Sequence, residues 1–386
     1  MKKIMLALIL FTLFIFKVNA IEINSTNAIL YNLNDDIIIY EKDANEKVQI
    51  ASLTKIVTAI TIIDNIEDLN QNITITNSML QNLTGYAKAG LKVGDKVTYL
   101  DLLYALMLPS GADAAQALAI SYSGDIESFV EEMNKEINKI GVKNTNFENP
   151  IGMDSINNFS TASDMAQILK YSLNNSTFKT IFQTDEYTIN SIDLKLKKTT
   201  LDKAKKYDLD VSNITGSKTG YTDLAGYCLA STSTIDNVNY LLITLGADTN
   251  YPYNIKDAVD LYNYYSSNYS YKTIIKKDQL LKTLKIEHSK QKQLNITSDK
   301  DINLYLSNNY DINKLYYEYE GIEKINKKIK VGDKLGIINV KYDDELIYIY
   351  EIYLNQEIEY YNYALYGSIL VGVLILMKVC YNAFRK

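Results

Sequence analysis

Two hydrophobic segments, one at each end, constrain this 386-residue chain more than any other feature of its sequence. Residues 1–20 have a basic start, an apolar run over 4–16 and small residues at Val18 and Ala20. This order is typical of a secretory signal peptide that is cut after Ala20. An uncleaved membrane anchor is the alternative, although the apolar run is short for a membrane span.

The C-terminal segment covers 363–384 and contains a single charge, Lys378. As a helix it would extend about 33 Å, enough to cross the hydrocarbon core of a bilayer. Arg385 and Lys386 follow it, so the positive-inside rule places the tail in the cytoplasm and the rest of the chain on the extracytoplasmic face. We therefore expect a single-pass protein of the cell membrane. An amphipathic helix lying flat on the membrane is the alternative.

Between its ends the chain is acidic. The two ends hold six basic and no acidic residues, so the net charge of −6 for the whole chain leaves −12 on residues 21–362. Nucleic acids and anionic lipid headgroups are bound by basic surfaces. We therefore expect no nucleic-acid partner, and a membrane contact only through the C-terminal helix.

Histidine and cysteine are scarce. One His and two Cys are too few for a structural zinc site, an iron–sulfur cluster or a disulfide scaffold, and we expect neither a metal nor a cofactor. A Ser-His-Asp triad would have to use His288. A serine nucleophile in this chain is therefore expected to rely on a lysine as its base.

The order of helix and strand patterns indicates an α+β fold in which helices pack on an antiparallel sheet. Short β-rich runs at 28–33 and 37–40 predict a hairpin, and an apolar helix is expected from Ser52 onward. Further helices are expected at 100–107, 114–120, 126–140, 164–173 and 258–265, and further strands at 214–220, 227–233 and 240–245.

The pattern changes after about residue 268. Alternating strands rich in Lys and Tyr, such as 335–342 and 346–354, predict a small all-β module. The expected domains are a signal peptide at 1–20, the α+β domain at 21–268, the β-rich domain at 269–358, and a membrane anchor with a short cytoplasmic tail at 359–386.

Ser52 and Lys55 form the first candidate catalytic pair. Three residues apart on a helix, they share one face, so the amine can reach the hydroxyl. Burial near a second cation would favour the neutral amine that a general base requires. The same spacing recurs twice, at Ser176/Lys179 and at Ser289/Lys292. Ser52 differs from these because it caps an apolar helix that follows a hairpin.

Two further motifs carry suitable chemistry. Ser110 lies in a Pro-Ser-Gly break between two expected helices, and Lys218-Thr219-Gly220 lies on an expected strand. Lys supplies positive charge, Thr a hydroxyl for a substrate carboxylate, and Gly room for a substrate backbone at the strand edge. Taken singly, a capping serine in a turn and an ordinary surface strand explain these motifs as well.

Taken together and in this order, the three motifs resemble those of the penicillin-recognising serine enzymes, in particular the serine-type D-alanyl-D-alanine carboxypeptidases, the low-molecular-mass penicillin-binding proteins. The resemblance covers about residues 25–265 and includes 147–153 and 160–166. It implies a penicillin-binding/β-lactamase-like domain. The β module and C-terminal anchor match the usual layout of this family.

The resemblance also implies roles for the catalytic residues. Ser52 would be the acylated nucleophile and Lys55 its general base. Ser110 would relay the proton to the leaving amine. Lys218 would tune the electrostatic field around Ser110 and Lys55. The implied reaction removes the terminal D-alanine from peptidoglycan stem pentapeptides through an acyl-enzyme, and β-lactams would be covalent inhibitors.

Substrate binding is implied at the same strand. Thr219 would hold the terminal carboxylate, with Lys218 and Gly220 beside it. The backbone N–H groups of Ser52 and Tyr221 would form the oxyanion hole.

Three positions depart from the family pattern. Ala112 stands where Asn is common, Ile151 where His is frequent, and Asn254 close to where a basic residue often helps to bind the carboxylate. The only Arg of the chain lies in its tail, so Lys218 or Lys256 would have to supply that charge. These departures put rate and substrate preference in doubt more than acylation.

Two other functions remain open. A weakly active penicillin-binding or sporulation-related cell-wall scaffold would fit Ala112 and the missing Arg. A serine β-lactamase would share the motifs, but an anchored β module is unusual for such an enzyme.

Overall fold

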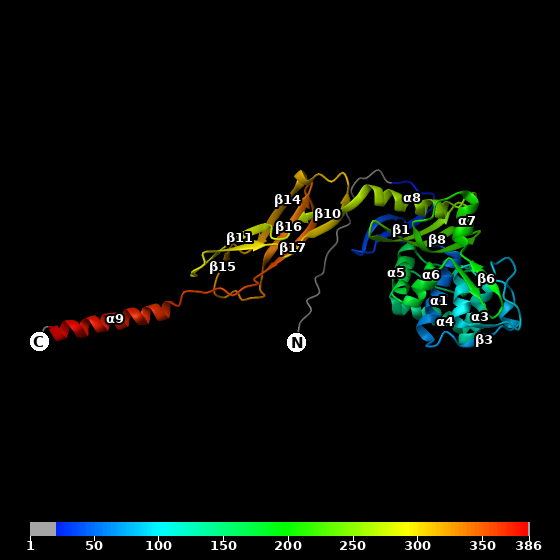
Figure 1. The fold of residues 1–386 in the computed structure, drawn as a ribbon, viewed down its shortest axis with the longest axis horizontal. Helices are drawn as coiled ribbons and strands as arrows, with labels where there is room; N and C mark the ends of the chain where they lie inside the picture. Colours follow the sequence, from blue (N-terminus) through cyan, green and yellow to red (C-terminus); the bar gives the residue numbers. More distant parts are fainter. Residues whose placement is uncertain (1–20, 385–386) are drawn as a thin grey trace. The chain divides into compact units, whose positions relative to one another are not determined.

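The computed structural model describes residues 21–384, so the expected signal peptide at 1–20 lies outside the described residues. The chain divides after Ser267 into two compact units, each with its own hydrophobic core. Figure 1 shows both units along the chain. An α+β unit followed by an all-β unit and a C-terminal helix confirms the expected fold class.

An antiparallel five-stranded sheet with the order β2-β1-β9-β8-β7 forms the framework of the N-terminal unit. Its strands are β1 (Asn27–Asn32), β2 (Ile37–Lys42), β7 (Ile214–Thr222), β8 (Gly226–Ile235) and β9 (Val238–Ala247). Every residue of β1 is buried, because this strand lies inside the sheet and pairs with β9 from the far end of the unit. Strand β7 is the last in the order, so its outer edge pairs with no other strand among residues 21–384.

Helix α1 (Thr54–Asn65) lies at the centre of the helical layer. All its residues from Thr54 to Ile63 are buried, as expected for a helix that is apolar on every side. It packs against α2 (Tyr99–Met107), α3 (Ala112–Ser123), α4 (Ile126–Ile140), α5 (Ala162–Leu173) and α6 (Ser176–Gln183). In Figure 1 these helices lie on one side of the sheet.

The opposite face of the sheet carries α8 (Tyr253–Asn268). The hydroxyls of Tyr262 on this helix and Ser231 on β8 are 2.9 Å apart and buried. Helix α7 (Thr199–Tyr207) also contacts β7 on this face, where the hydroxyls of Thr200 and Ser217 are 2.8 Å apart. Two short turns, η1 (Ala51–Leu53) and η2 (Ser78–Leu80), and two small hairpins, β3 (Asn72–Thr74) with β4 (Lys96–Thr98) and β5 (Glu186–Ile189) with β6 (Leu194–Lys197), complete the unit.

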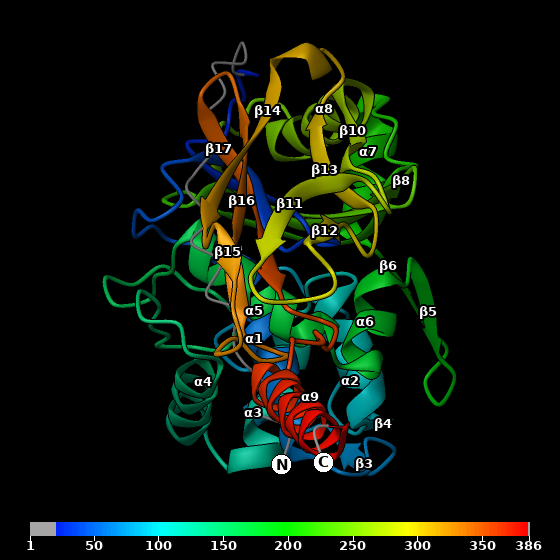
Figure 2. The same ribbon diagram turned by 90° about the vertical axis from the view of Figure 1, so that its left-hand side faces the viewer.

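The C-terminal unit is built from β-strands. They are β10 (Tyr269–Ile275), β11 (Leu280–Ile286), β12 (Gln293–Thr297), β13 (Ile302–Ser307), β14 (Leu315–Gly321), β15 (Lys324–Ile325), β16 (Lys334–Tyr342) and β17 (Glu345–Tyr353), with the turn η3 (Ile312–Lys314) between β13 and β14. Figure 2 shows β14, β16 and β17 side by side, as their antiparallel pairing requires. The turn residues Asp343 and Asp344 both have positive φ, which suits a tight hairpin between β16 and β17.

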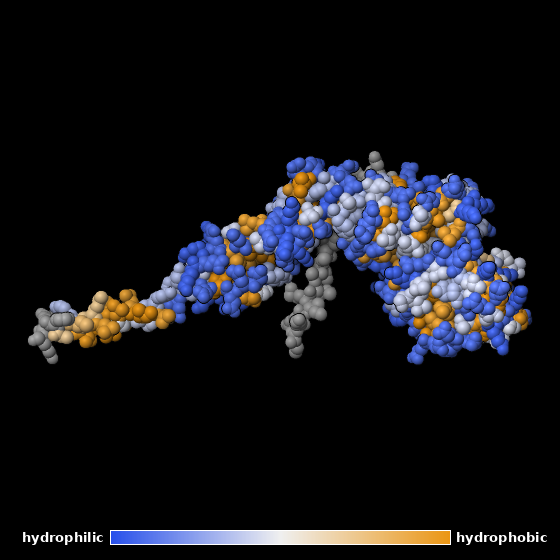
Figure 3. All heavy atoms as spheres, viewed as in Figure 1, coloured by the Kyte–Doolittle hydropathy of each residue, from blue (hydrophilic) through white to orange (hydrophobic). Residues whose placement is uncertain are grey.

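Helix α9 (Tyr363–Phe384) follows the C-terminal unit. Within residues 21–384 it is the one helix that is long and apolar enough to cross a membrane, and its apolar side chains are exposed. Its hydrophobic surface is visible in Figure 3.

Candidate active site

Ser52 and Lys55 meet at the junction of η1 and α1. The Lys55 Nζ donates a hydrogen bond of 2.9 Å to the Ser52 Oγ and a second of 2.6 Å to the carbonyl oxygen of Ile151. Neither of these two acceptors carries a negative charge that would stabilise a protonated Lys55. The sequence pattern thus places an amine within proton-transfer distance of a serine hydroxyl.

The helix start differs from the prediction. Ser52 was expected to cap an apolar α-helix, but this is wrong because α1 begins at Thr54 and its N-cap residue is Leu53, which makes no side-chain cap. Ser52 lies instead in the tight turn η1, directly after Ala51 at a φ of 48°. Positive φ is unfavourable for alanine, and such strain is often found beside reactive residues. The Ser52 hydroxyl therefore accepts a hydrogen bond from Lys55 and does not cap the helix.

The electrostatic state of Lys55 suits a general base. Burial lowers the pKa of Lys55 to about 7, although the negative charge of Asp113 acts in the opposite direction. Near neutral pH a substantial fraction of the amine is therefore unprotonated and able to accept the Ser52 proton.

Ser110 and Lys218 form a second pair of the same type. The Lys218 Nζ donates hydrogen bonds of 2.8 Å to the Ser110 Oγ and of 2.7 Å to the Thr219 carbonyl oxygen. Burial lowers the pKa of Lys218 well below its usual range, and the positive charges of Lys55 and Lys203 lower it further. Ser110 has a φ of 64° in the break between α2 and α3, so both serines adjoin strained backbone.

Strand β7 presents two chemically different faces. A Cβ added at Gly216 would lie 2.5 Å from the Phe182 ring on α6, so Gly216, Lys218 and Gly220 face the helical layer. Ser217 contacts Thr200 on α7, so Ser217, Thr219 and Tyr221 face the opposite side.

Gly220 brings β7 close to the candidate nucleophile. A Cβ added there would lie 3.1 Å from the Ser52 backbone N and 3.0 Å from the Ile50 carbonyl oxygen. Gly152 approaches from the other side, with φ +81° and room for no Cβ, since that atom would lie 2.0 Å from the Ala51 carbonyl oxygen. Two glycines thus enclose the turn that carries Ser52.

The structure accounts for two of the departures from the family pattern. Lys55 uses the backbone carbonyl of Ile151, so the missing His side chain leaves this contact intact. Asp113 accepts hydrogen bonds from the backbone N–H groups of Ala89, Gly90, Leu91 and Ala114. Asp113 therefore anchors a loop and is not a substitute for the amide that Ala112 lacks.

Lys256, one of the two lysines expected to supply the carboxylate-binding charge, already has an acidic partner. Lys256 forms an ion pair with Asp260 on the same helix. Asn254 is buried and its Nδ2 donates to the Cys228 carbonyl oxygen at 2.8 Å, so this position supplies no positive charge. Cys228 is buried and burial raises the pKa of its thiol to about 12, so it is inert as a nucleophile.

The two other S-x-x-K matches have ordinary roles. Ser176 and Lys179 are exposed on α6. Ser289 is buried, but its hydroxyl donates to the Glu359 carbonyl oxygen at 2.7 Å, within the β unit.

Three residues at the site had no assigned role from the sequence. Asn149 accepts from the N–H groups of Ile151, Gly152 and Met153, and thereby folds the loop that holds the Lys55 acceptor. Thr58 on α1 donates to the Pro150 carbonyl oxygen at 2.7 Å and fixes that loop to the helix. Lys203 is the third. The Asn-Pro pair was visible as a turn signal, but nothing in the sequence connects Lys203 to β7.

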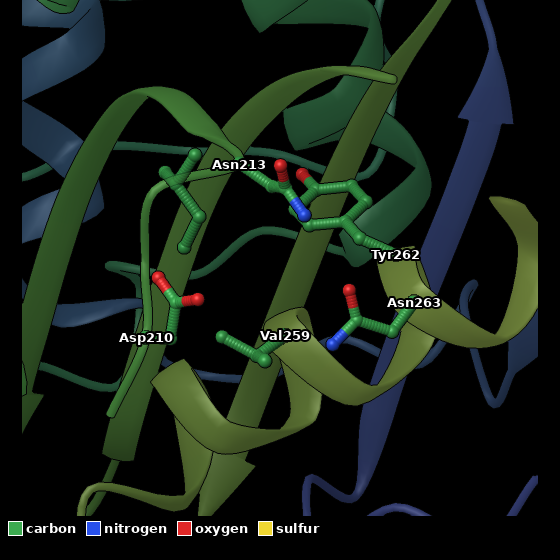
Figure 4. A pocket seen from close by; sticks show the side chains of 6 residues that line it. Asp210, Asn213, Val259, Tyr262 and Asn263 are labelled. Carbon is green, nitrogen blue, oxygen red and sulfur yellow. The ribbon is translucent and has the colours of Figure 1, made fainter. Parts of the chain in front are cut away.

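A small pocket lies elsewhere in the unit. Figure 4 shows Asp210, Asn213, Val259, Tyr262 and Asn263 around it, at the start of β7 and along α8. Its volume is about 20 Å³, which holds a water molecule and no peptide. It contains neither a nucleophile nor a base of the candidate site.

Comparison with known proteins agrees with this arrangement. The sequence profile of the D-alanyl-D-alanine carboxypeptidases, peptidase S11, matches residues 15–249, and the profile of the C-terminal domain of penicillin-binding protein 5 matches residues 269–360. The D-alanyl-D-alanine carboxypeptidase DacF of Bacillus subtilis (strain 168) is 28% identical over 327 residues, which cover 83% of this chain and 82% of that protein. A D-alanyl-D-alanine carboxypeptidase of Streptomyces sp. (strain K15) is 34% identical over 238 residues, 58% of this chain and 81% of that protein.

Solved structures show the same folds. Penicillin binding protein 5 from Haemophilus influenzae matches with a TM-score of 0.67 at 23% identity, covering 88% of this chain and 99% of that one. The Streptomyces K15 DD-transpeptidase matches with a TM-score of 0.57 at 30% identity, covering 63% of this chain and 97% of that one.

Proposed function

Because this chain belongs to the peptidase S11 family of D-alanyl-D-alanine carboxypeptidases, which are serine hydrolases, we propose that Ser52 is its nucleophile and Lys55 the general base. The chain is a penicillin-binding serine peptidase that acts on peptides ending in D-Ala-D-Ala. The observation that carries the residue assignment is the 2.9 Å contact from the Lys55 Nζ to the Ser52 Oγ, made by an amine whose pKa burial lowers to about 7.

Acylation of Ser52 is the first half of the proposed reaction. Neutral Lys55 takes the proton of the Ser52 hydroxyl while the oxygen attacks the carbonyl carbon of the penultimate D-alanine. The backbone N–H groups of Ser52 and Tyr221 hold the oxyanion. Ser110 passes its proton to the nitrogen of the terminal D-alanine as the C–N bond breaks, and recovers a proton from the Lys55 ammonium, which becomes neutral again. Lys218 orients Ser110 through their 2.8 Å hydrogen bond.

Deacylation returns the enzyme to its starting state. Neutral Lys55 takes a proton from water as the water oxygen attacks the ester carbonyl, and it returns this proton to the Ser52 oxygen as that oxygen leaves. The peptide, shortened by one D-alanine, is released.

The substrate binds along β7 in this proposal. The outer edge of β7 pairs with no other strand in the described part of the chain, so an extended peptide can pair with its backbone. Gly220 lets the turn that carries Ser52 lie close against β7, and the Thr219 hydroxyl receives the terminal carboxylate.

A penicillin-binding scaffold with slow turnover is the second candidate. Ala112 favours it, because its buried side chain supplies no amide to hold the substrate backbone. The two intact lysine–serine pairs favour the enzyme.

We further propose that the chain is a single-pass membrane protein, with the catalytic and β-rich domains outside the cell and α9 as the anchor. The apolar, exposed surface of α9 supports the anchor, and the basic tail supports its orientation. The proposed domains remain 21–268, 269–358 and 359–386, after a signal peptide at 1–20.

The residue assignment is tested by labelling with a fluorescent penicillin and by measuring D-alanine release from a peptide ending in D-Ala-D-Ala. Ser52→Ala is expected to lose both activities, whereas the control Ser176→Ala, at the exposed S-x-x-K match, is expected to keep both. A wild-type protein that takes no label would overturn the assignment. Labelling without D-alanine release would favour the scaffold.

A further inference from the structure

The substrate of this enzyme ends in a carboxylate, and the candidate site must supply a positive charge for it. A neutral Thr219 hydroxyl gives a hydrogen bond but no countercharge. Lys55 and Lys218 are poor choices, because both side chains are fully buried and each amine is hydrogen-bonded to a serine.

The lysines near the start of α8 and at the start of α7 already form ion pairs with acidic side chains. Lys256 is paired with Asp260. Lys198 is paired with Asp185 at 3.1 Å and donates to the Phe182 carbonyl oxygen.

Lys203 on α7 differs from all of these. Its Nζ lies 4.0 Å from the centre of the Tyr227 ring, and within residues 21–384 it makes no hydrogen bond or ion pair. Its side chain is half-buried, and burial lowers the pKa of its amine. A half-buried ammonium with only an aromatic face beside it is a cation that lacks an anion.

Helix and strand periodicity place Lys203 beside the expected carboxylate position. Thr200 contacts Ser217, and Lys203 follows Thr200 by one helical turn on the same face of α7, about 4.5 Å along the axis. Thr219 follows Ser217 by two residues on the same face of β7, roughly 7 Å along the strand.

The tyrosines at the end of this face fix the direction in which Lys203 reaches. Tyr227, beneath the Lys203 amine, is paired with Tyr221 across β7 and β8, and their rings are 5.1 Å apart. The neighbouring pair along the same face is Thr219 with Leu229. Lys203 is also close enough to Lys218 for its charge to lower the pKa of that amine.

We propose that Lys203 is a substrate-binding residue that pairs with the C-terminal carboxylate of the peptide next to Thr219, in the place where this chain has no arginine. The proposal rests on the proposed function, because it takes its ligand from that reaction. A bound carboxylate would supply the anion that Lys203 lacks. The enzyme would then select peptides with a free C-terminus.

The test compares two substrates on the full-length protein: a peptide ending in D-Ala-D-Ala and the same peptide as its C-terminal amide. Lys203→Met keeps the length of the side chain and removes its charge. We expect KM for the free acid to rise roughly 10-fold or more, the scale of one charge-assisted hydrogen bond, with little change for the amide. Lys203→Arg should restore the preference for the acid.

The control is Lys205→Met, which removes an exposed charge from the same helix and is expected to leave both substrates unaffected. Thermal unfolding of each variant separates a loss of fold from a loss of binding. Equal losses on acid and amide, or none on either, would overturn the role of Lys203. A wild type that cleaves neither peptide and takes no penicillin label would instead remove the proposed function, and this inference with it.

Discussion

Lys55 must be unprotonated before it can accept a proton from Ser52. Because burial lowers the pKa of Lys55 to about 7, we expect the rate constant for acylation by penicillin to rise about tenfold per pH unit below 7 and to level off above it. The charge of Lys55 in turn lowers the pKa of Lys218. Stopped-flow or gel labelling between pH 5 and 9 measures this profile, and a midpoint near 10 would contradict it.

Gly152 is the residue at which an added methyl group is least tolerable. Its Cβ would lie 2.0 Å from the Ala51 carbonyl oxygen, and its φ of +81° disfavours any side chain. We expect Gly152→Ala to lower the free energy of unfolding by roughly 3 kcal/mol or more and to abolish penicillin labelling, because both backbone strain and a steric clash act on the turn that carries Ser52.

Gly85→Ala separates these two causes. Gly85 has nearly the same φ, +84°, but open space around its Cβ position. Only the backbone strain applies at Gly85. We therefore expect chemical denaturation to show that Gly85→Ala lowers the free energy of unfolding by about 1–2 kcal/mol, and we expect penicillin labelling to be normal. Similar effects of both substitutions would show that the close approach to Ala51 is unimportant.

At the scale of elements, helices with strong apolar periodicity were predictable from sequence. The expected helix over 126–140 agrees with α4, and the tripeptide Lys218-Thr219-Gly220 lies on a strand as expected. Helix α7 was not predicted, because of its nine residues only Thr200 and Ala204 are buried and no apolar stripe marks it. Lys203 was missed for the same reason.

Tertiary contacts also decide details that local sequence does not contain. The start of α1 moved from Ser52 to Thr54 because the turn before it is held by Gly152 and Gly220, which are distant in sequence. The carbonyl that receives Lys55 belongs to Ile151, where only the side chain was considered from sequence. Motif spacing thus predicted the Ser52–Lys55 pair, and the family resemblance implied that Lys218 acts on Ser110, whereas long-range packing sets the geometry of both pairs.

The loop over 87–91 is tied to α3 by one side chain. Asp113 accepts from three N–H groups of this loop, and its charge opposes the lowering of the Lys55 pKa. We expect Asp113→Asn to destabilise the fold by roughly 1–3 kcal/mol, because an amide cannot accept all of these bonds. It should also move the acid limb of the acylation profile to lower pH, since the charge that raises the Lys55 pKa is gone.

Thermal unfolding and the pH profile of labelling measure these two effects separately. Asp101→Asn is a suitable control, because this carboxylate caps α2 and accepts from Thr98 without contributing to the pKa of Lys55. A limb that moves to higher pH in Asp113→Asn would contradict the assigned electrostatic role.

At the scale of the whole molecule, the end of the folded C-terminal unit can be located from its contacts. The Ser289 hydroxyl donates to the Glu359 carbonyl oxygen, the Tyr361 N–H donates to the His288 carbonyl oxygen at 2.8 Å, and the Tyr360 hydroxyl donates to Asn326. Contacts of the β unit therefore extend past the proposed boundary at residue 358 as far as Tyr361, and α9 adds one at its first residue, where the Tyr363 hydroxyl lies 3.3 Å from the His288 Nδ1.

A chain that stops after Asn362 keeps these three contacts and loses the proposed anchor together with the contact between Tyr363 and His288. We expect it to move from the membrane to the soluble fraction when exported from bacterial cells, and to release D-alanine from a soluble peptide at the rate of the full-length protein. The full-length chain is the control and should stay in the membrane fraction through a high-salt wash, because burial of apolar side chains in lipid does not depend on ionic strength. If the truncated chain remains membrane-bound and mass spectrometry finds residues 1–20 still attached, the N-terminal segment is the anchor and the cleaved signal peptide is wrong. If it is soluble but inactive on the soluble peptide, α9 supports the catalytic unit as well as anchoring it.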